Sequence, residues 1–132
     1  MSKPARLVAL WAPPLALMAL IFAFSAMPSD VESRAWWDLV LRKATHFGEY
    51  AVLCALWFRA LRQSLSSDAA LAAAVGICVL YAVSDELHQT FVDGRTGTWR
   101  DVLIDTAGAL TAAVAIRRRA QSQPRSVASR TA

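Results

Sequence analysis

Charged residues are scarce in this chain, and hydrophobic residues are unusually frequent. Asp, Glu, Lys and Arg together make up 18% of the 132 residues, whereas hydrophobic residues make up 56%. A soluble domain ordinarily has about 25% charged residues, so this composition argues against a soluble fold. At this length the chain has room for one domain and no more.

Cysteine is scarce too, and signals of disulfides, cofactors and nucleic-acid binding are missing. Cys54 and Cys78 each lie within an apolar run, where cysteine usually serves as a small hydrophobic side chain, and they form neither a CxxC pair nor a disulfide framework. The sequence carries no sign of a nucleotide, haem or flavin site. The net charge of +4 does not indicate nucleic acid, because the bases stand at the ends of apolar segments and not on a polar face with interleaved aromatics.

What the sequence does have is four apolar blocks. We expect helices at about residues 7–27, 39–61, 69–88 and 98–116. The first block has no charge between residues 7 and 24, so with its flanks it can cross a hydrocarbon core of about 30 Å at roughly 1.5 Å per residue. A cleavable signal peptide wants a small residue at the −3 position. Cleavage after Ala26 would put Phe24 there, so we expect an uncleaved anchor.

The distribution of charge decides between a membrane bundle and a soluble one. If the N terminus is inside and the chain crosses four times, the inner side holds one acid, Asp68, and the bases Lys3, Arg6, Arg59, Arg62, Arg117, Arg118, Arg119, Arg125 and Arg130. The outer side holds the other acids and the bases Arg34, Arg42, Lys43, Arg95 and Arg100. This excess of inner bases is the positive-inside pattern of membrane proteins. We therefore predict an all-α fold, a four-helix transmembrane bundle in the bacterial cytoplasmic membrane with both termini cytoplasmic, in which residues 1–119 form the membrane domain and 120–132 a disordered tail.

Polar residues stand where apolar ones would be expected at the outer ends of the last three blocks. They are Lys43, His46, Glu49, Asp85, Glu86, His88, Gln89, Asp101 and Asp105. Charged side chains are costly in lipid, so they normally face a bundle interior or a wet cavity and pair there. Because three helices contribute such groups at similar depth, we expect one shared polar cavity that opens outward. We take these nine residues as the candidate catalytic cluster.

Helical spacing places several of these residues on shared faces. One face carries Lys43, His46, Glu49 and Tyr50, and another carries Asp101, Asp105 and Gly108. Gly108 and Ala112 also form a small-xxx-small pair, which lets a neighbouring helix approach closely.

The chemistry of the cluster stays open at this point. A mixed set of His, Glu, Asp and Lys can do general acid–base work, but the same residues can be structural ion pairs, for example Lys43 with Glu49. His46, Glu49, Glu86 and His88 are also residue types that bind zinc or manganese. The sequence has no HExxH pattern, and we expect no metal or other cofactor.

The connection before the fourth block, residues 91–100, carries two arginines. Arg95 and Arg100 can clamp a phosphate or carboxylate through paired hydrogen bonds, or they can pair with Asp85, Glu86 or Asp101. Together with Tyr50 they are the predicted ligand-binding residues.

Three stretches have the form of known motifs. Residues 42–50, RKATHFGEY, look like a basic residue followed by HFxEY, and residues 84–91, SDELHQTF, look like SDExHQxF. Gly94-Arg95, followed by Asp101, Asp105 and Gly108, looks like GR…DVxxD/NxxG. Together, over roughly residues 7–116, the chain resembles the VanZ-like family of small bacterial integral membrane proteins.

The resemblance implies a protein of the bacterial cell envelope, because the founding member is associated with resistance to the glycopeptide teicoplanin. The resemblance does not identify a chemical reaction. Our preferred hypothesis is a cavity that binds, and in one version modifies, an anionic lipid or a lipid-linked wall precursor, with Lys43, Arg95 and Arg100 holding the anionic group. One alternative is a non-enzymatic accessory protein that binds a lipoglycopeptide or a membrane partner. A second is a small proton-coupled transporter with Glu49 and Asp105 as a relay. Self-association is left open.

Overall fold

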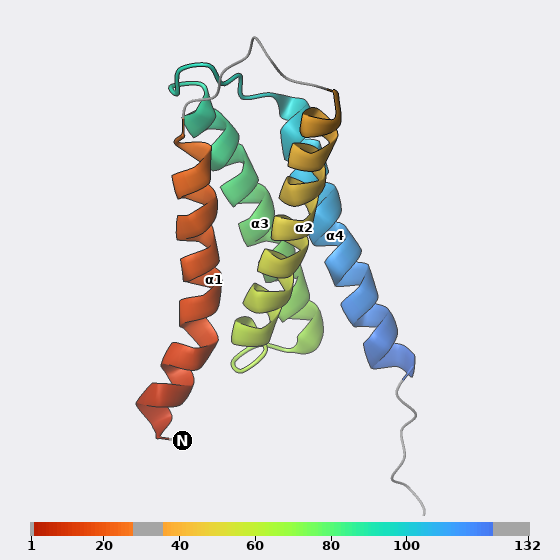
Figure 1. Cartoon of the computed structure of the whole chain (residues 1–132). Coiled ribbons are helices and arrows are strands. Elements are labelled where there is room, and N and C mark those ends of the chain that lie inside the picture. Colours follow the sequence, from red (N-terminus) through yellow and green to blue (C-terminus); the bar gives the residue numbers. More distant parts are fainter. Residues whose placement is uncertain (1, 28–35, 123–132) are drawn as a thin grey trace, which may run out of the picture.

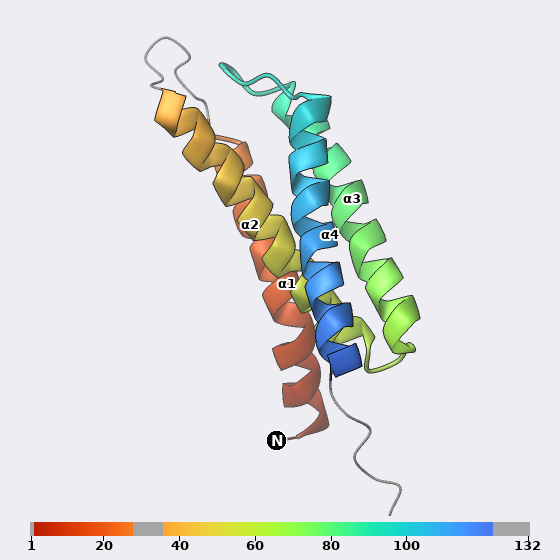
Figure 2. The same cartoon turned by 90° about the vertical axis from the view of Figure 1, so that its right-hand side faces the viewer.

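The computed structural model describes residues 2–27 and 36–122, which form four helices. These are α1 (Lys3–Ser25), α2 (Trp36–Leu61), α3 (Ser67–Gln89) and α4 (Trp99–Ser122). The helices run alternately up and down, so that the start of α1 and the end of α4 lie at the same end of the bundle (Figures 1 and 2). The predicted all-α architecture of four helices is confirmed for the described residues, whereas four membrane crossings and their direction stay predictions.

Most helix ends differ from those expected by one to four residues, and the end of α4 differs by six. α1 ends at Ser25, two residues before its predicted end. α4 continues to Ser122, so residues 120–122, which we assigned to a disordered tail, are helical. The remainder of the predicted tail, 123–132, lies outside the described residues, as does the α1–α2 connection at 28–35 with Arg34.

The apolar side chains of the helices face outward to an extent that a soluble core would not allow. α1 and α3 are both long and apolar enough to cross a membrane, yet only 11% and 22% of their most apolar stretches are buried inside the bundle. The interior meanwhile contains Asp85, Glu86, Gln89 and Asp105, all nine-tenths or more buried. A polar interior under an apolar exterior suits a protein whose solvent is lipid.

A proline pair lies inside α1 without ending it. Pro13 has no N–H to donate to the carbonyl of Ala9, the residue four positions earlier. Arg59 of α2 donates to that carbonyl instead. Membrane helices tolerate proline where a neighbour satisfies the freed backbone group, so Arg59 both repairs α1 and links it to α2.

α2 and α4 pack most closely at a glycine. A Cβ atom on Gly108 would lie 2.1 Å from the carbonyl oxygen of Phe47, nearer than any real Cβ contact. Ala109 next to it is fully buried. The predicted role of Gly108 as a point of close helix approach is therefore confirmed. This contact fixes the rotation and depth of α4 against α2, and hence the position of the polar residues one and two turns above it.

Replacing Gly108 with alanine should destabilise the bundle, because α4 must move away from α2. Overpacking of this kind typically costs about 1–3 kcal/mol. Gly76→Ala is the matched control, since a Cβ there meets nothing within 4 Å and both substitutions gain the same helix propensity, up to about 1 kcal/mol. Thermal unfolding of the two purified variants in one detergent measures the difference. Equal midpoints would contradict the close contact.

Candidate functional site

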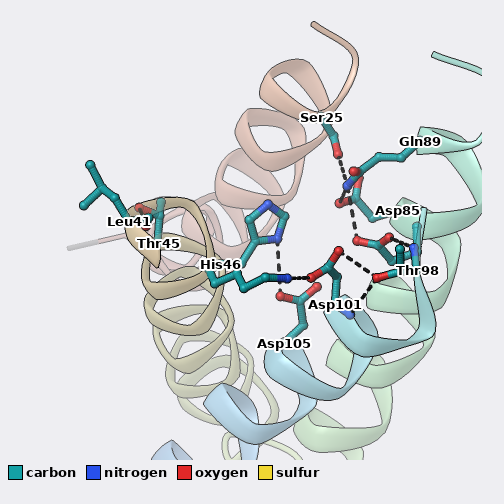
Figure 3. A network of polar contacts seen from close by, with 11 residues as sticks. Ser25, Leu41, Thr45, His46, Asp85, Gln89, Thr98, Asp101 and Asp105 are labelled. Carbon is teal, nitrogen blue, oxygen red and sulfur yellow. Dashed lines mark hydrogen bonds and ion pairs between the residues drawn. The ribbon is translucent and has the colours of Figure 1, made fainter. Parts of the chain in front are cut away.

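The polar residues of the chain gather at the end of the bundle away from the termini. α2 and α4 begin there and α1 and α3 end there (Figures 1 and 2). In Figure 3 the side chains from α2, α3 and α4 point toward one another, and Ser25 reaches them from α1. All four helices therefore contribute to one polar site.

A chain of contacts joins α2, α4 and α3. Lys43 forms an ion pair with Asp101. The Thr98 hydroxyl donates to Asp101 Oδ2 at 2.9 Å, and the Thr98 backbone N–H donates to Glu86 Oε2 at 2.8 Å. Thr98 immediately precedes α4 and Asp101 lies in its first turn, the usual positions of a capping residue and its acidic partner. The cap that starts α4 is thus also the link between Lys43 and α3.

Gln89 extends this chain to α1. Its amide nitrogen donates to Ser25 Oγ at 2.8 Å and to Asp85 Oδ2 at 3.1 Å, and it lies 3.4 Å from Glu86 Oε1. Asp85 and Glu86 precede Gln89 by four and three residues, so all three lie on one face of α3. Gln89 therefore holds two buried acids in place and ties them to the end of α1 (Figure 3).

His46 and Asp105 form a second, separate pair. His46 Nδ1 lies 3.3 Å from Asp105 Oδ1, and the Asp105 side chain is fully buried. Because Nδ1 is the ring nitrogen beside the carboxylate, although the two form no hydrogen bond in this geometry, Nε2 is the nitrogen left to exchange a proton with a bound molecule. A buried carboxylate on a histidine fixes the tautomer and orientation of the ring and stabilises its protonated form. The pair is therefore suited to general acid–base chemistry.

Two cavities meet at this histidine. The smaller, of about 150 Å³, lies among α2, α4, the end of α3 and the α3–α4 loop. The larger, of about 430 Å³, lies between α1 and α2 and also touches Arg95 of the loop. Arg42, His46 and Arg95 line both. The two cavities therefore lie on either side of the same three side chains.

The larger cavity has an amphiphilic lining. Its apolar wall includes Ile21, Phe24 and Leu41, and its polar wall includes the carboxylates of Asp38 and Glu49. The smaller cavity is the more polar of the two, with Lys43, Glu86, Gln89, Asp101 and Asp105 on its walls. The larger cavity therefore has the more apolar wall of the two.

Most of the candidate cluster comes together in this site. Lys43, His46, Glu86, Gln89, Asp101 and Asp105 line the smaller cavity, and Glu49 lines the larger one. Asp85 is buried behind these residues and accepts a hydrogen bond from Gln89. Lys43 pairs with Asp101 of α4 and not with Glu49, so the structural ion pair is present but with another partner.

Three predicted residues lie elsewhere. The His88 ring stacks on Phe22 of α1 at 4.4 Å between centroids. Tyr50 is fully buried with its ring 6.2 Å from that of Tyr81, and it lines neither cavity. Arg100 is exposed over the Trp99 ring and also lines neither cavity.

Arg95 lines both cavities, but it also supports the fold. Its Nε donates to the carbonyl of Met27 and its Nη2 to that of Phe24, both at 2.8 Å. These carbonyls belong to the end of α1, where backbone acceptors lack partners within the helix. The predicted alternatives for Arg95 were an anionic ligand or an acidic side chain, and the backbone is a third kind of acceptor that we did not anticipate.

The structure adds three residues to the predicted set. Arg42 lines both cavities, and its place directly before Lys43 in the first motif was a signal for it. Thr98 stands three residues before Asp101, a capping pattern that is readable in the sequence. Ser25 had no such signal, because only the packing of α1 brings it to Gln89.

No metal centre is evident in the part of the chain that the structure describes. Within residues 2–27 and 36–122, no group of three or more His, Cys, Asp or Glu side chains lies close enough to hold a metal ion. The predicted metal alternative needed His46, Glu49, Glu86 and His88 to converge. His88 instead lies against Phe22.

Comparison with known proteins agrees with the three motifs. No curated protein and no solved structure matches the chain significantly. The family model described as VanZ/LLP1 matches residues 10–119, a stretch that contains the whole network and both cavities. The chain therefore belongs to the VanZ/LLP1 family.

Proposed function

We propose that this protein crosses the bacterial cytoplasmic membrane four times and binds an envelope amphiphile in its outward-facing cavities. The ligand would be an anionic lipid or a lipid-linked wall precursor. The observation that carries the proposal is the polar network beneath an apolar exterior, which ends in two adjacent cavities with Arg42 and His46 lining both. Membership of the VanZ/LLP1 family, with its link to teicoplanin resistance, supports a role in the cell envelope.

The lengths and charges of the helices support four crossings with both termini in the cytoplasm. α2 and α4 have 26 and 24 residues, so at about 1.5 Å per residue each exceeds the roughly 30 Å of a hydrocarbon core. Their lower hydropathy comes from the polar residues at the site end and from Arg59, Arg117, Arg118 and Arg119 at the other end. At the other end lie one acid, Asp68, and the described bases Lys3, Arg6, Arg59, Arg62, Arg117, Arg118 and Arg119. The positive-inside rule places that end in the cytoplasm.

The charges of the smaller cavity favour a head group with more than one kind of polar group. Its three cations, Arg42, Lys43 and Arg95, face three acids, Glu86, Asp101 and Asp105. A simple anion would meet as many carboxylates as cations. A phosphate or carboxylate joined to hydroxyl or amino groups can satisfy both, since guanidinium groups bind the anion and carboxylates accept from the donors.

The larger cavity favours a ligand with a hydrocarbon chain. Ile21 and Phe24 of α1 and Leu41 of α2 give it an apolar wall next to His46. α1 and α2 are neighbours at the outside of the bundle (Figure 2), so a chain between them would remain in contact with the bilayer. A lipid-linked sugar or peptide fits this combination better than a small soluble anion does.

His46 is the group best placed to act on a bound molecule. Nε2 would take a proton from a hydroxyl group or a water molecule, and Asp105 would stabilise the imidazolium that forms. The alternative of binding without chemistry draws on a different observation. Lys43, Gln89 and Thr98 are already engaged with Asp101, Ser25 and Glu86, which makes much of the network a rigid support.

The transporter alternative finds less support. A relay from Glu49 and Asp105 toward the other end needs polar side chains along the bundle interior. The buried residues that follow in that direction are Leu53, Cys54, Trp57, Ala74 and Cys78. Among the described residues this layer offers no chain of titrating groups at neutral pH to pass a proton.

Replacing His46 with glutamine should abolish the effect of the protein on its ligand. Envelope lipids and wall precursors would be compared by mass spectrometry in cells lacking the gene and in cells complemented with wild type, His46→Gln or Arg100→Gln. We expect one lipid-linked species to change with wild type. Loss of a general base typically lowers a rate by about 100-fold or more, so His46→Gln should match the deletion. Glu49→Gln is expected to do the same, because its carboxylate lines the cavity beside His46.

Arg100→Gln is the matched control, because Arg100 lies near the site but lines neither cavity. It should behave as wild type, and equal amounts of every variant in the membrane fraction should exclude failed insertion. If all strains share one lipid profile, binding without chemistry is favoured over an enzyme. A wild-type profile from His46→Gln, beside a changed one in the deletion strain, would rule out His46 as the base.

Reporter fusions should test the direction of the helices. Fusions after Arg62 and after Arg118 are expected to report the cytoplasm, and a fusion at Ser33 the outside, because the basic end should stay inside. Paired reporters, one active in the cytoplasm and one outside it, give a positive signal for each location. An external signal after Arg118 would contradict four crossings.

A further inference from the structure

A third cavity lies at the basic end of the bundle and shares no residue with the site above. It has a volume of about 300 Å³ and lies between the end of α2, the start of α3 and the end of α4. Its charged residues are Arg62, Arg117, Arg119 and Asp68. Its apolar residues include Phe58, Leu71 and Ile116. Three separate helices thus bring cations and an apolar floor together.

The arginines of this cavity are not neutralised by neighbouring acids. No carboxylate of the described residues lies within ion-pair distance of any of the three, since the ion pairs found in residues 2–27 and 36–122 both belong to the other end. Arg62 packs over the Phe58 ring at 5.9 Å. Three arginines and one aspartate give the cavity a net formal charge of +2. Like charges held together in this way attract an anion.

The apolar floor indicates what kind of anion would bind. Phe58, Leu71 and Ile116 are half-buried, whereas the three arginines are exposed; Phe58 lies one turn before Arg62, and Ile116 directly precedes Arg117. In a bilayer this order, cations at the helix ends and apolar side chains deeper, matches a phosphate head group above its acyl chains. A small soluble anion would use the arginines but leave the floor uncovered.

We propose that this cavity binds the phosphodiester of an anionic phospholipid in the leaflet next to the chain termini. The guanidinium groups of Arg62, Arg117 and Arg119 hold the phosphate, because their planar donors match its oxygens. One acyl chain covers Phe58, Leu71 and Ile116. The lipid then bridges α2, α3 and α4 at the end opposite the polar network and stabilises their packing there.

The test is retention of phosphatidylglycerol by the full-length protein. Purified protein in a neutral detergent would be titrated with phosphatidylglycerol or phosphatidylcholine, and bound lipid would be counted by native mass spectrometry. Wild type should retain phosphatidylglycerol in preference and unfold at a higher temperature with it. Arg62→Gln/Arg119→Gln should weaken retention by at least about tenfold, since each basic residue near an anionic lipid contributes about 1 kcal/mol, or about fivefold, and two are removed.

Lys3→Gln/Arg118→Gln is the matched control. It removes two charges at the same end of the bundle, and Arg118 adjoins Arg117 and Arg119 in sequence, but neither residue lines the cavity. Its retention of phosphatidylglycerol should stay close to that of wild type. An equal loss in both double variants would overturn the proposal, because only total charge would then matter. If the test variant does not fold, Arg119→Gln against Arg118→Gln, both exposed on the last turns of α4, carries the same comparison.

A comparison with soluble anions tests whether the cavity binds the phosphate of a lipid or a phosphate free in solution. Glycerophosphoglycerol and inorganic phosphate, at the concentration that saturates with phosphatidylglycerol, should leave the unfolding temperature unchanged. An equal stabilisation by either would overturn the lipid assignment in favour of a soluble anion site. Because no residue is shared with the outer cavities, His46→Gln should retain phosphatidylglycerol normally. The lipid proposal rests on the proposed membrane crossings but not on a ligand in the outer cavities, so loss of either ligand leaves the other proposal standing.

Discussion

The pairing of charge inside an apolar bundle is the constraint from which the rest of this structure follows. A carboxylate or an ammonium group removed from water must find a partner, because an isolated buried charge costs several kcal/mol. The fully buried Asp105 of α4 meets that demand at His46 of α2, and Asp101 of α4, which is partly exposed, pairs with Lys43 of α2. The two pairs thus fix α4 against α2 at the polar end, as the Gly108–Phe47 contact does deeper in the bundle. Gln89 then locks α3 and α1 onto the same framework.

This constraint also explains which part of the site could be predicted from the sequence. Charges that interrupt apolar blocks are visible in a linear chain, so the sequence could place His46, Asp85 and Asp105 at the same end of their helices. Their partners did not follow, because a partner depends on how each helix is rotated. Lys43 could reach an acid on its own helix or on another, and only the close approach at Gly108 decides for Asp101. Ser25 is the extreme case, since nothing near it in the sequence indicates Gln89.

Two arginines donate to backbone carbonyl groups that were not expected to be their acceptors. A guanidinium group near a site suggests an anionic ligand, but the end of a helix offers carbonyl groups with the same demand for donors. Arg59 meets a carbonyl that Pro13 leaves free, and Arg95 meets two at the end of α1. From the sequence, acidic side chains were the only groups expected to compete with an anionic ligand for Arg95 and Arg100. The proline pair and the end of the first apolar block were readable signals that backbone acceptors would compete for these cations.

The bundle separates its polar groups into two ends with an apolar layer between them. Leu53, Cys54, Ala74 and Cys78 fill that layer without exposing any surface, so each end can bind its own ligand without a polar path to the other. The separation also accounts for the uneven hydropathy of the helices. α2 and α4 carry the cations and acids that pair with each other, whereas α1 and α3 supply the long apolar surfaces. A bundle of only four helices can hold a polar site in a membrane because α2, α3 and α4 share its charged groups at one end, while α1 and the remainder of α3 supply the most apolar surface.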